Sequence, residues 1–481
     1  MLTSLKTALF LLLILISPAL YAQGDTGKIS LPKYSTAQLN ADFAVFKNAL
    51  TEAHPSLYRY QTKAAMDAIF KTAEGKLSKP MDADEFWRVV EPVVASLHSA
   101  HTDFSSSAGQ NLFYLRYPAN QLPSFFYAQG DDIFIKSKKK GDTLERVYKV
   151  TGIEGVPSKT LLDTLKKYVS GEGTSQQFIY HQLQGGGFSK VYGKVLGYKP
   201  AYSFNMIDST GKEISRNVKA VTARIVMASD RFDQILGLKR DELNTAVSVN
   251  YPSDIPSTAI LKIKGFTYNK YYSSFHQQFF ALLKRDKIKN LVIDLRGNGG
   301  GSFIIGQNIM RYLVTGSVTQ VEGMDRPNKT TTFNDYVVPG QVADNKPLPT
   351  ETAIGGDRVS SYALDFFEGK VYVLIDKGTF SAAAIFAASL KAQRKIMLIG
   401  EETGGGDAGT DAGFFTSIKL PNSGLILRLP RYRISSLAAD RKSTHGLMPD
   451  VPVTDDIRQN VNIDLVTVKL KELILSNNGK K

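Results

Sequence analysis

The sequence predicts a layered α/β protein with a helical N-terminal part and a β-rich middle part. From Thr258 onward, strand-like apolar runs alternate with helical patterns, which is typical of a layered α/β domain. Apolar residues recur at helical spacing over 35–100, and short β-rich runs fill 115–173. A chain of 481 residues predicts two or three domains, and 43% hydrophobic with 22% charged residues is typical of a folded protein.

The first 22 residues are expected to be a secretory signal peptide. Lys6 precedes an apolar run over 8–16, which is far shorter than the ~20 residues that a membrane span needs. Cleavage is expected after Ala22, although Leu20 is larger than the small residue preferred three positions before the cut. Because no later stretch is apolar enough to span a membrane, we expect an exported protein, periplasmic or extracellular, without a transmembrane segment.

Composition narrows the expected chemistry. The absence of cysteine excludes disulfides and thiolate metal sites. A net charge of +14 can favour nucleic acid or anionic membranes, but the positive residues are spread along the chain. The one dense cluster, Lys136 with 138–140, lies between two strand-like runs and is interpreted as a solvated hairpin tip. No nucleic-acid motif accompanies it, so no nucleic-acid partner is expected.

The pattern divides the mature chain into four parts. An N-terminal helical subdomain is expected over 23–105, with helices from about 35 to 50, 64 to 77 and 82 to 97. A β-rich subdomain follows over 106–175, with strands near 125–127, 132–136 and 147–151 and a helix over 158–169. Residues 176–255 are expected to be a β-rich connecting region, and 256–481 an α/β core.

The core strands are recognised by short apolar runs bounded by turn residues. The strands are expected at 259–263, 290–295, 371–375, 395–399 and 425–429, with helices at 268–282 and 303–313 and after Ser381.

Ser381 lies where the strand 371–375 turns into an alanine-rich helix. A serine at such a corner lies beside unpaired backbone N–H groups and the positive end of a helix dipole, which suits a nucleophile whose attack creates an oxyanion. The alternative is an ordinary helix N-cap serine.

A serine nucleophile needs a base, which a histidine or a lysine could supply. Among the histidines, His101 lies where a side chain can point into a cleft; the alternatives are a structural role for His101 and a lysine from elsewhere in the chain. His101 follows a predicted helix and precedes a probable strand. The pair His98 and His101, with Asp103, also allows a metal interpretation, but no further ligand is suggested and no metal is predicted. Lys391 is ten residues beyond Ser381 on the same helix, ~15 Å along its axis, and is too far to act.

The glycine run 297–301 follows a buried strand and opens a helix. Its backbone N–H groups could hold an anion, either a phosphate or the oxyanion of a tetrahedral intermediate. The run matches neither the P-loop nor the full dinucleotide pattern.

Together these segments resemble the S41 family of serine peptidases, the tail-specific or C-terminal processing peptidases and their tricorn-like relatives. The segments are Asp294-Leu-Arg-Gly-Asn-Gly-Gly-Gly301, Gly378-Thr-Phe-Ser-Ala-Ala383 with Gly400-Glu-Glu-Thr-Gly-Gly405, and His445-Gly-Leu-Met-Pro-Asp450. The resemblance implies a ClpP/crotonase-like core over 256–481 and a PDZ-like module over 106–175.

The same resemblance implies the roles of the site residues. Ser381 is the nucleophile, and the oxyanion donors are the N–H of Ala382 and one in Gly299–Gly300. Gly406 stands where the processing branch has its lysine, so the chain is similar to the histidine-based branch, with His101 as base. Asp440 is the expected orienting acid, with Glu401 as the alternative.

The expected function is that of an exported serine endopeptidase that needs no cofactor and acts on peptides or unfolded proteins. The alternative is a weak or inactive protein of the same fold that binds peptides or apolar ligands. Homo-oligomerisation is left open.

Overall fold

The computed structural model describes residues 30–116, 120–123, 126–137, 146–222, 247–267, 272–327, 331–339, 358–437, 440–454 and 463–478. The predicted signal peptide and the lysines at 138–140 lie outside these residues. The chain divides into residues 1–32 and a second unit, residues 33–481, which contains every helix and strand described below. Over the described ranges, the helices are too short or too polar to cross a membrane.

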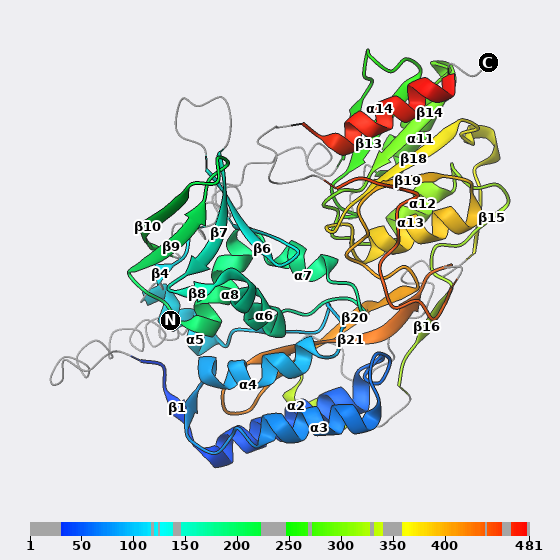
Figure 1. The fold of residues 1–481 in the computed structure, drawn as a ribbon. Helices are drawn as coiled ribbons and strands as arrows, with labels where there is room; N and C mark the ends of the chain where they lie inside the picture. The colour runs from blue at the N-terminus through cyan, green and yellow to red at the C-terminus, as the bar shows by residue number, and fades with distance from the viewer. Residues whose placement is uncertain are drawn as a thin grey trace, which may run out of the picture. The chain divides into compact units, whose positions relative to one another are not determined.

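A six-stranded sheet forms the C-terminal part of the second unit (Figure 1). Five neighbouring strands run parallel, and the edge strand β12 is antiparallel to β13. In spatial order the strands are β12 (Val247–Asn250), β13 (Thr258–Ile263), β14 (Asn290–Asp294), β18 (Lys370–Ile375), β19 (Met397–Gly400) and β22 (Val451–Pro452).

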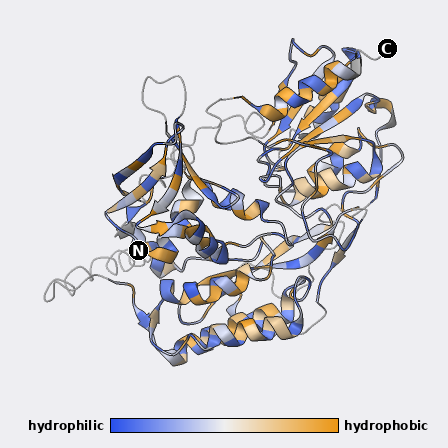
Figure 2. Cartoon of the chain, in the orientation of Figure 1, coloured by the Kyte–Doolittle hydropathy of each residue, from blue (hydrophilic) through white to orange (hydrophobic). Residues whose placement is uncertain are grey.

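Helices cover both faces of this sheet, as the buried strands require. Leu291 and Ile293 pack with three helices on one face, whereas Val292 packs with α14 on the other. The first three helices are α11 (Tyr272–Arg285), α12 (Phe303–Met310) and α13 (Ala382–Gln393), and α14 is Leu465–Asn478. Figure 2 shows hydrophobic residues gathered on the strands of this six-stranded sheet. The predicted layered α/β fold is confirmed.

The N-terminal helical layer consists of α2 (Thr36–Ala53), α3 (Lys63–Glu74) and α4 (Ala83–Ala95), close to the predicted positions. Capping boxes start two of them: Ser35 with Gln38 before α2, and Asp82 with Glu85 before α4. The short strands β1 (Lys33–Tyr34) and β2 (Met81–Asp82) pair beside them.

A long β-hairpin, β20 (Gly409–Lys419) and β21 (Ile426–Ser435), joins two hydrophobic cores, that of the N-terminal helices and that of the α/β part. Its Ile418 and Leu427 pack with the N-terminal helices, whereas Ala412 and Ile434 belong to the core of the α/β part. The strands β16 (Gly323–Asp325) and β3 (Asp103–Ser105) pair with β21. Residues near both cores therefore meet along one hairpin.

The middle of the chain forms a second six-stranded sheet, which we call the β module. It contains β5 (Phe126–Gln129), β6 (Asp132–Ser137), β7 (Arg146–Ile153), β8 (Val156–Pro157), β9 (Ala201–Ile207) and β10 (Glu213–Lys219). The helices α6 (Ser158–Leu165), α7 (Gln177–Gln182) and α8 (Gly186–Leu196) lie between β8 and β9 in the sequence.

The sheet of the β module therefore continues past the predicted boundary at 175, since β9 pairs with β7. In addition, α7 and α8 occupy residues where only strand-like pieces and turns were predicted. Helix α8 opens with glycines and is fixed by packing: the ring of Phe188 stacks on Phe126 of the sheet, 4.6 Å between centroids. Tertiary contact here overrides weak local propensity.

The remaining elements are short. They include α5 (Ala108–Arg116), the pair β4 (Asn120–Gln121) with β11 (Val221–Thr222), and the pair β15 (Ser317–Val318) with β17 (Val359–Ser360).

Candidate active site

Ser381 lies at a strained corner between β18 and α13. Its φ of 53° and ψ of −127° are rare for a residue with a side chain. It occupies the N-cap position of α13, but its hydroxyl makes no capping hydrogen bond. An ordinary N-cap serine would accept a hydrogen bond from a backbone amide of the helix. The Ser381 hydroxyl does not, so the alternative interpretation is not supported.

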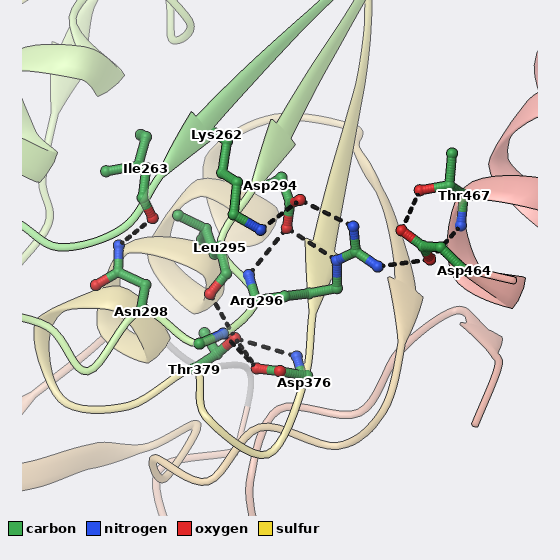
Figure 3. A network of polar contacts seen from close by, with 11 residues as sticks. Lys262, Ile263, Asp294, Leu295, Arg296, Asn298, Asp376, Thr379, Asp464 and Thr467 are labelled. Carbon is green, nitrogen blue, oxygen red and sulfur yellow. Dashed lines mark hydrogen bonds and ion pairs between the residues drawn. The ribbon is translucent and has the colours of Figure 1, made fainter. Parts of the chain in front are cut away.

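The loop before α12 is fixed by an ionic network at the ends of β13 and β14 (Figure 3). Arg296 donates to both carboxylate oxygens of Asp294, at 3.0 and 2.9 Å, and its other end reaches Asp464 before α14 at 2.7 Å. Burial acts to raise the pKa of Asp294, but Arg296 and Lys262 hold it below its usual range. The strand end is therefore rigid where the glycine run begins.

Backbone and side-chain hydrogen bonds tie the glycine loop to the Ser381 corner (Figure 3). The amide of Gly297 donates to Asp376 at 2.8 Å, and the Thr379 hydroxyl donates to the carbonyl of Leu295 at 3.0 Å. The amide of Phe380 donates to the carbonyl of Asn298 at 2.9 Å. The two predicted segments, far apart in the sequence, thus form one unit.

Gly300 packs directly against the Ser381 corner. Its φ is +99°, and a Cβ added to it would lie 2.8 Å from the Cβ of Ser381 and 2.9 Å from the amide nitrogen of Ala382. Its own amide donates to the side chain of Asn298 at 2.9 Å. A side chain at this position cannot be accommodated without moving the corner.

Ser381 and His101 line the same cavity, which has a volume of about 540 Å³. Gly299 also lines it. Within the described part of the chain, the amides of Gly299 and Ala382 donate to no protein acceptor, whereas that of Gly300 is occupied by Asn298. The cavity wall consists of Ala100, His101, Gly299, Gly301, Ser302, Phe303, Phe380, Ser381, Ala412, Gly413, Phe414, Phe415 and Arg428.

The two histidines after α4 do not share a helix face, because α4 ends at Ala95. His98 has φ 54° and packs against the ring of Tyr60, 6.0 Å between centroids. His101 instead points to the cavity. Among the described residues, no group of three His, Asp or Glu side chains is arranged to hold a metal ion.

The imidazole of His101 is held between aromatic rings and a hydroxyl. It stacks on Phe380, 4.7 Å between centroids, and its Nδ1 lies 3.2 Å from the hydroxyl of Thr410 on β20. Burial lowers the pKa of His101 to about 3; the positive charge of Arg428 adds to this effect and Asp411 opposes it. At neutral pH the imidazole is therefore uncharged, as a general base must be.

Behind Thr410 lies a buried group of charges that the sequence interpretation missed. The Thr410 hydroxyl lies close enough to Glu172 to act on the pKa of that carboxyl, and Glu172 follows the β module's helix α6 in the chain. Glu172 and Asp411 are each 3.6 Å from the guanidinium of Arg433, and all three side chains are buried. Burial raises the pKa of Glu172 and the charge of Asp411 raises it further, while Arg433 lowers it.

The expected orienting acid lies elsewhere. Asp440 is exposed, and its carboxylate accepts the amide of Lys442 at 2.8 Å within its own turn. The runner-up, Glu401, lines a different pocket with Glu402 and Lys377. The structure brings neither acid to His101, whose Nδ1 partner is Thr410. Sequence spacing could not reveal this, because Thr410 and Glu172 are 238 positions apart and each is an ordinary residue in its segment.

The glycine turn after β19 leaves no space for a lysine. A Cβ on Gly405 would lie 2.7 Å from the Cβ of Ala384 and 2.9 Å from the amide nitrogen of Ser381. A Cβ on Gly406 would lie 2.7 Å from the carbonyl oxygen of Gly409. The geometry around Ser381 thus favours a histidine over a lysine as its base.

Residues 257–453 match the model of peptidase family S41. This match spans less than half of the chain, so the likeness to S41 peptidases is shown for that segment. Over 193 residues the chain is 28% identical to the chloroplastic C-terminal processing peptidase of Tetradesmus obliquus; the match covers 40% of this chain. In that match the chain spans about a third, 34%, of the relative's length.

Solved structures extend the likeness of fold beyond the S41 segment. Mature CPAF has a TM-score of 0.61 at 14% identity, covering 92% of this chain and 99% of that chain. Mature CPAF complexed with lactacystin has a TM-score of 0.62 at 14% identity, covering 92% and 100%. The fold outside the S41 segment is therefore also shared with a solved protein.

Proposed function

We propose that this chain is an exported serine endopeptidase acting on peptides or unfolded proteins, with Ser381 as nucleophile and His101 as general base. One observation carries the proposal: Ser381 and His101 lie on the wall of one cavity. Ser381 has a strained backbone and a hydroxyl that makes no capping hydrogen bond, and His101 is uncharged at neutral pH. Export rests on the leader-like residues 1–22.

The reaction begins when the Ser381 hydroxyl oxygen attacks a peptide carbonyl carbon and its proton passes to Nε2 of His101. The negative charge moves to the carbonyl oxygen, where the amides of Gly299 and Ala382 donate to it. Collapse of the tetrahedral intermediate breaks the C–N bond, and the imidazolium gives its proton to the leaving amine. Water, deprotonated by His101, then hydrolyses the acyl-enzyme and releases Ser381.

Thr410 and Glu172 set the tautomer of His101 in this scheme. An ionised Glu172 can only accept, so it favours a Thr410 hydroxyl whose proton points toward the carboxylate and whose oxygen accepts from Nδ1–H of His101. That leaves Nε2 with its lone pair, as proton abstraction requires. A protonated Glu172 could instead donate to Thr410, which would then donate to Nδ1 and put the imidazole proton on Nε2.

A fluorophosphonate probe tests the proposal, because it reacts only with an activated serine. We expect labelling at Ser381, with peptide mapping to distinguish it from Ser302, the other serine on the cavity wall. Ser381→Ala should abolish both labelling and cleavage of an unfolded protein. His101→Ala should lower kcat by about three orders of magnitude or more.

Circular dichroism and thermal unfolding of both variants control for loss of fold. A folded parent protein that takes no label and cleaves no unfolded protein would favour the alternative, a binding protein on the same fold. Label on Ser302, or equal cleavage by Ser381→Ala and the parent, would refute the assignment of the nucleophile.

A further inference from the structure

The described part of the cavity wall carries one fixed charge. Among the described residues that line it, only His101 and Arg428 are ionisable, and His101 is uncharged at neutral pH. The rest of the wall is glycine, alanine, serine and four phenylalanines. A substrate bound next to Ser381 therefore meets an aromatic surface with a single cation.

With its polar neighbours among the described residues, the guanidinium of Arg428 has only long contacts. Its Nη1 lies 3.5 Å from the carbonyl oxygen of His101 and 3.6 Å from the carboxylate of Asp103. By contrast, Arg296 makes contacts of 2.7 to 3.0 Å with its two acids. Since an arginine has five N–H donors, Arg428 keeps most of its hydrogen-bonding capacity.

Stacking fixes the guanidinium at the cavity. It lies over the ring of Phe415, 3.6 Å from the centroid, while its side chain remains 37% exposed. The other two arginines of β21 are buried: Arg431 donates to Thr416, and Arg433 lies between Glu172 and Asp411. Arg428 is the arginine of this strand that faces the substrate space.

We propose that Arg428 determines specificity by binding a carboxylate of the peptide substrate in the Ser381 cavity. This rests on the proposed function. The carboxylate belongs either to an Asp or Glu side chain near the scissile bond or to the C-terminus of the substrate. A planar guanidinium stacked on an aromatic ring is suited to bidentate recognition of such a group.

The bound carboxylate would also assist the chemistry. The charge of Arg428 disfavours the imidazolium form of His101, which develops in the transition state. A substrate carboxylate on Arg428 offsets that charge. Acidic substrates should therefore gain in kcat as well as in KM.

The competing explanation is a structural ion pair. Arg428 and Asp103 are directly opposite in the register of β21 and β3, and Asp103 is 46% exposed. A solvent-exposed pair of this kind typically contributes little to stability. If holding β3 were its whole role, removal of either partner would have the same effect on every substrate.

The experiment compares Arg428→Gln with Asp103→Asn, which break the pair from opposite sides. Peptides carry Glu or Gln at each position in turn, and each is made with a free or an amidated C-terminus. Kd is measured on the Ser381→Ala background, and kcat and KM on the Ser381 background. The Glu and free-terminus arms separate the two sources of the carboxylate.

We expect one peptide that carries a carboxylate, either a Glu side chain or a free C-terminus, to bind about tenfold more tightly than the matched peptide with Gln or an amidated C-terminus in its place. Arg428→Gln should remove this preference, and Asp103→Asn should increase it, because Asp103 competes for the guanidinium. Arg428→Glu should favour a Lys-containing peptide. Equal preference in Arg428→Gln and its parent, or parallel losses in both variants regardless of substrate charge, would overturn the inference.

The two proposals fail separately. A charge preference on the Ser381→Ala background, with no fluorophosphonate label in the parent, supports Arg428 and contradicts the peptidase mechanism. Labelling at Ser381 without any charge preference does the reverse.

Discussion

Ser381 adopts a backbone conformation that favours glycine. Its φ of 53° with ψ of −127° costs on the order of 1–3 kcal/mol for a residue with a Cβ. The glycine loop and the turn around Asp376 hold this strain in place. Placement of the hydroxyl on the cavity wall depends on it.

We therefore expect Ser381→Gly to unfold at a higher temperature than Ser381→Ala, by an amount equivalent to about 1 kcal/mol. Both variants lack the hydroxyl, so both should be inactive. The measurement is thermal unfolding of the two proteins side by side. Equal stability of the two variants would show that the corner is not strained.

The pH dependence of activity should report Glu172 rather than His101. The pKa of His101 is lowered to about 3, so the imidazole loses no basic form between pH 5 and 8. The pKa of Glu172 is raised by burial and by Asp411, so it gains its charge at a higher pH than an ordinary glutamate. Arg433 and the Thr410 hydroxyl oppose that rise, and Tyr60 also faces the group.

Because ionised Glu172 selects the active tautomer, kcat/KM should rise with pH as Glu172 loses its proton. In Glu172→Gln this rise should be absent, since the amide does not titrate. Thr410→Val should lower kcat at all pH values, and Thr410→Ser should restore it. The same rise in Glu172→Gln as in the parent would assign the titration to another group.

At the residue scale, the sequence predicted the groups whose signal is local. Ser381 follows an apolar strand and precedes an alanine-rich helix, and the glycines at 299 and 300 follow another strand. Thr410 carries no such signal, because its partner on His101 is 309 positions away. The roles of Ser381, His101, Gly299 and Ala382 remain predictions for the experiments above.

At the element scale, helix α7 extends a stack of rings to His101. The rings of His101, Phe380, Phe178 and His181 follow one another at centroid distances of 4.7, 3.9 and 5.8 Å. Phe178 and His181 both lie on α7. Helix α7 thus packs against Phe380, the ring on which His101 stacks.

Phe178→Leu should therefore lower the rate of fluorophosphonate labelling at Ser381, by about tenfold, because Phe380 and His101 lose their support. Phe275→Leu is the matched control. Phe275 stacks on Phe279 at 5.9 Å on α11 and does not line the cavity. The control should change thermal stability but leave labelling unchanged; equal effects of the two substitutions would exclude a specific role for α7.

The loop 297–301 provides a second test at this scale. Gly300→Ala would place a methyl group 2.8 Å from the Cβ of Ser381 at φ +99°, so the corner must shift and labelling should be lost. Gly323→Ala is the control, since its Cβ would meet no atom within 4 Å and its φ is ordinary. Wild-type labelling of Gly300→Ala would show that the corner tolerates the displacement.

Elements with strong periodicity were predicted closely, whereas those fixed by long-range packing were not. Helices α2, α3 and α4 lie near their predicted ranges because capping residues and apolar spacing agree. Helices α7 and α8 were missed, because α7 has only six residues and α8 opens with two glycines, and ring stacking holds both. The pairing of β9 with β7 likewise depends on tertiary contacts that no local pattern encodes.

At the scale of the whole molecule, buried acids lie where its parts meet. Glu172 follows the β module's helix α6, and its neighbours Asp411 and Arg433 belong to the hairpin that links the two cores. Glu91 of α4 is also buried; burial raises its pKa to about 8, while Lys194 of α8 lowers it. Each carboxylate is destabilising when charged, because burial removes its hydration.

Glu172 and Glu91 allow the effect of pH on stability to be separated from its effect on activity, because both are buried and only Glu172 lies near Thr410. For an acid whose pKa is raised on folding, the folded state binds more protons between the unfolded pKa, near 4.5, and the folded pKa. The free energy of unfolding therefore falls as pH rises through that window. Replacement by glutamine removes the titration.

We expect Glu172→Gln and Glu91→Gln both to raise the free energy of unfolding at pH 9, by more than about 1 kcal/mol relative to the parent at that pH. For Glu172→Gln a further reason applies, since Arg433 and Asp411 are then left as a one-to-one pair. Arg433→Leu should have the opposite sign and destabilise by about 3–5 kcal/mol, because two buried carboxylates lose their cation. Urea unfolding at pH 5, 7 and 9 measures the stability of all three variants.

Of the two glutamine variants, only Glu172→Gln should also change the pH profile of kcat/KM, because Glu91 does not contact Thr410 or His101. An altered profile in Glu91→Gln would mean that the profile reflects global stability rather than the tautomer of His101.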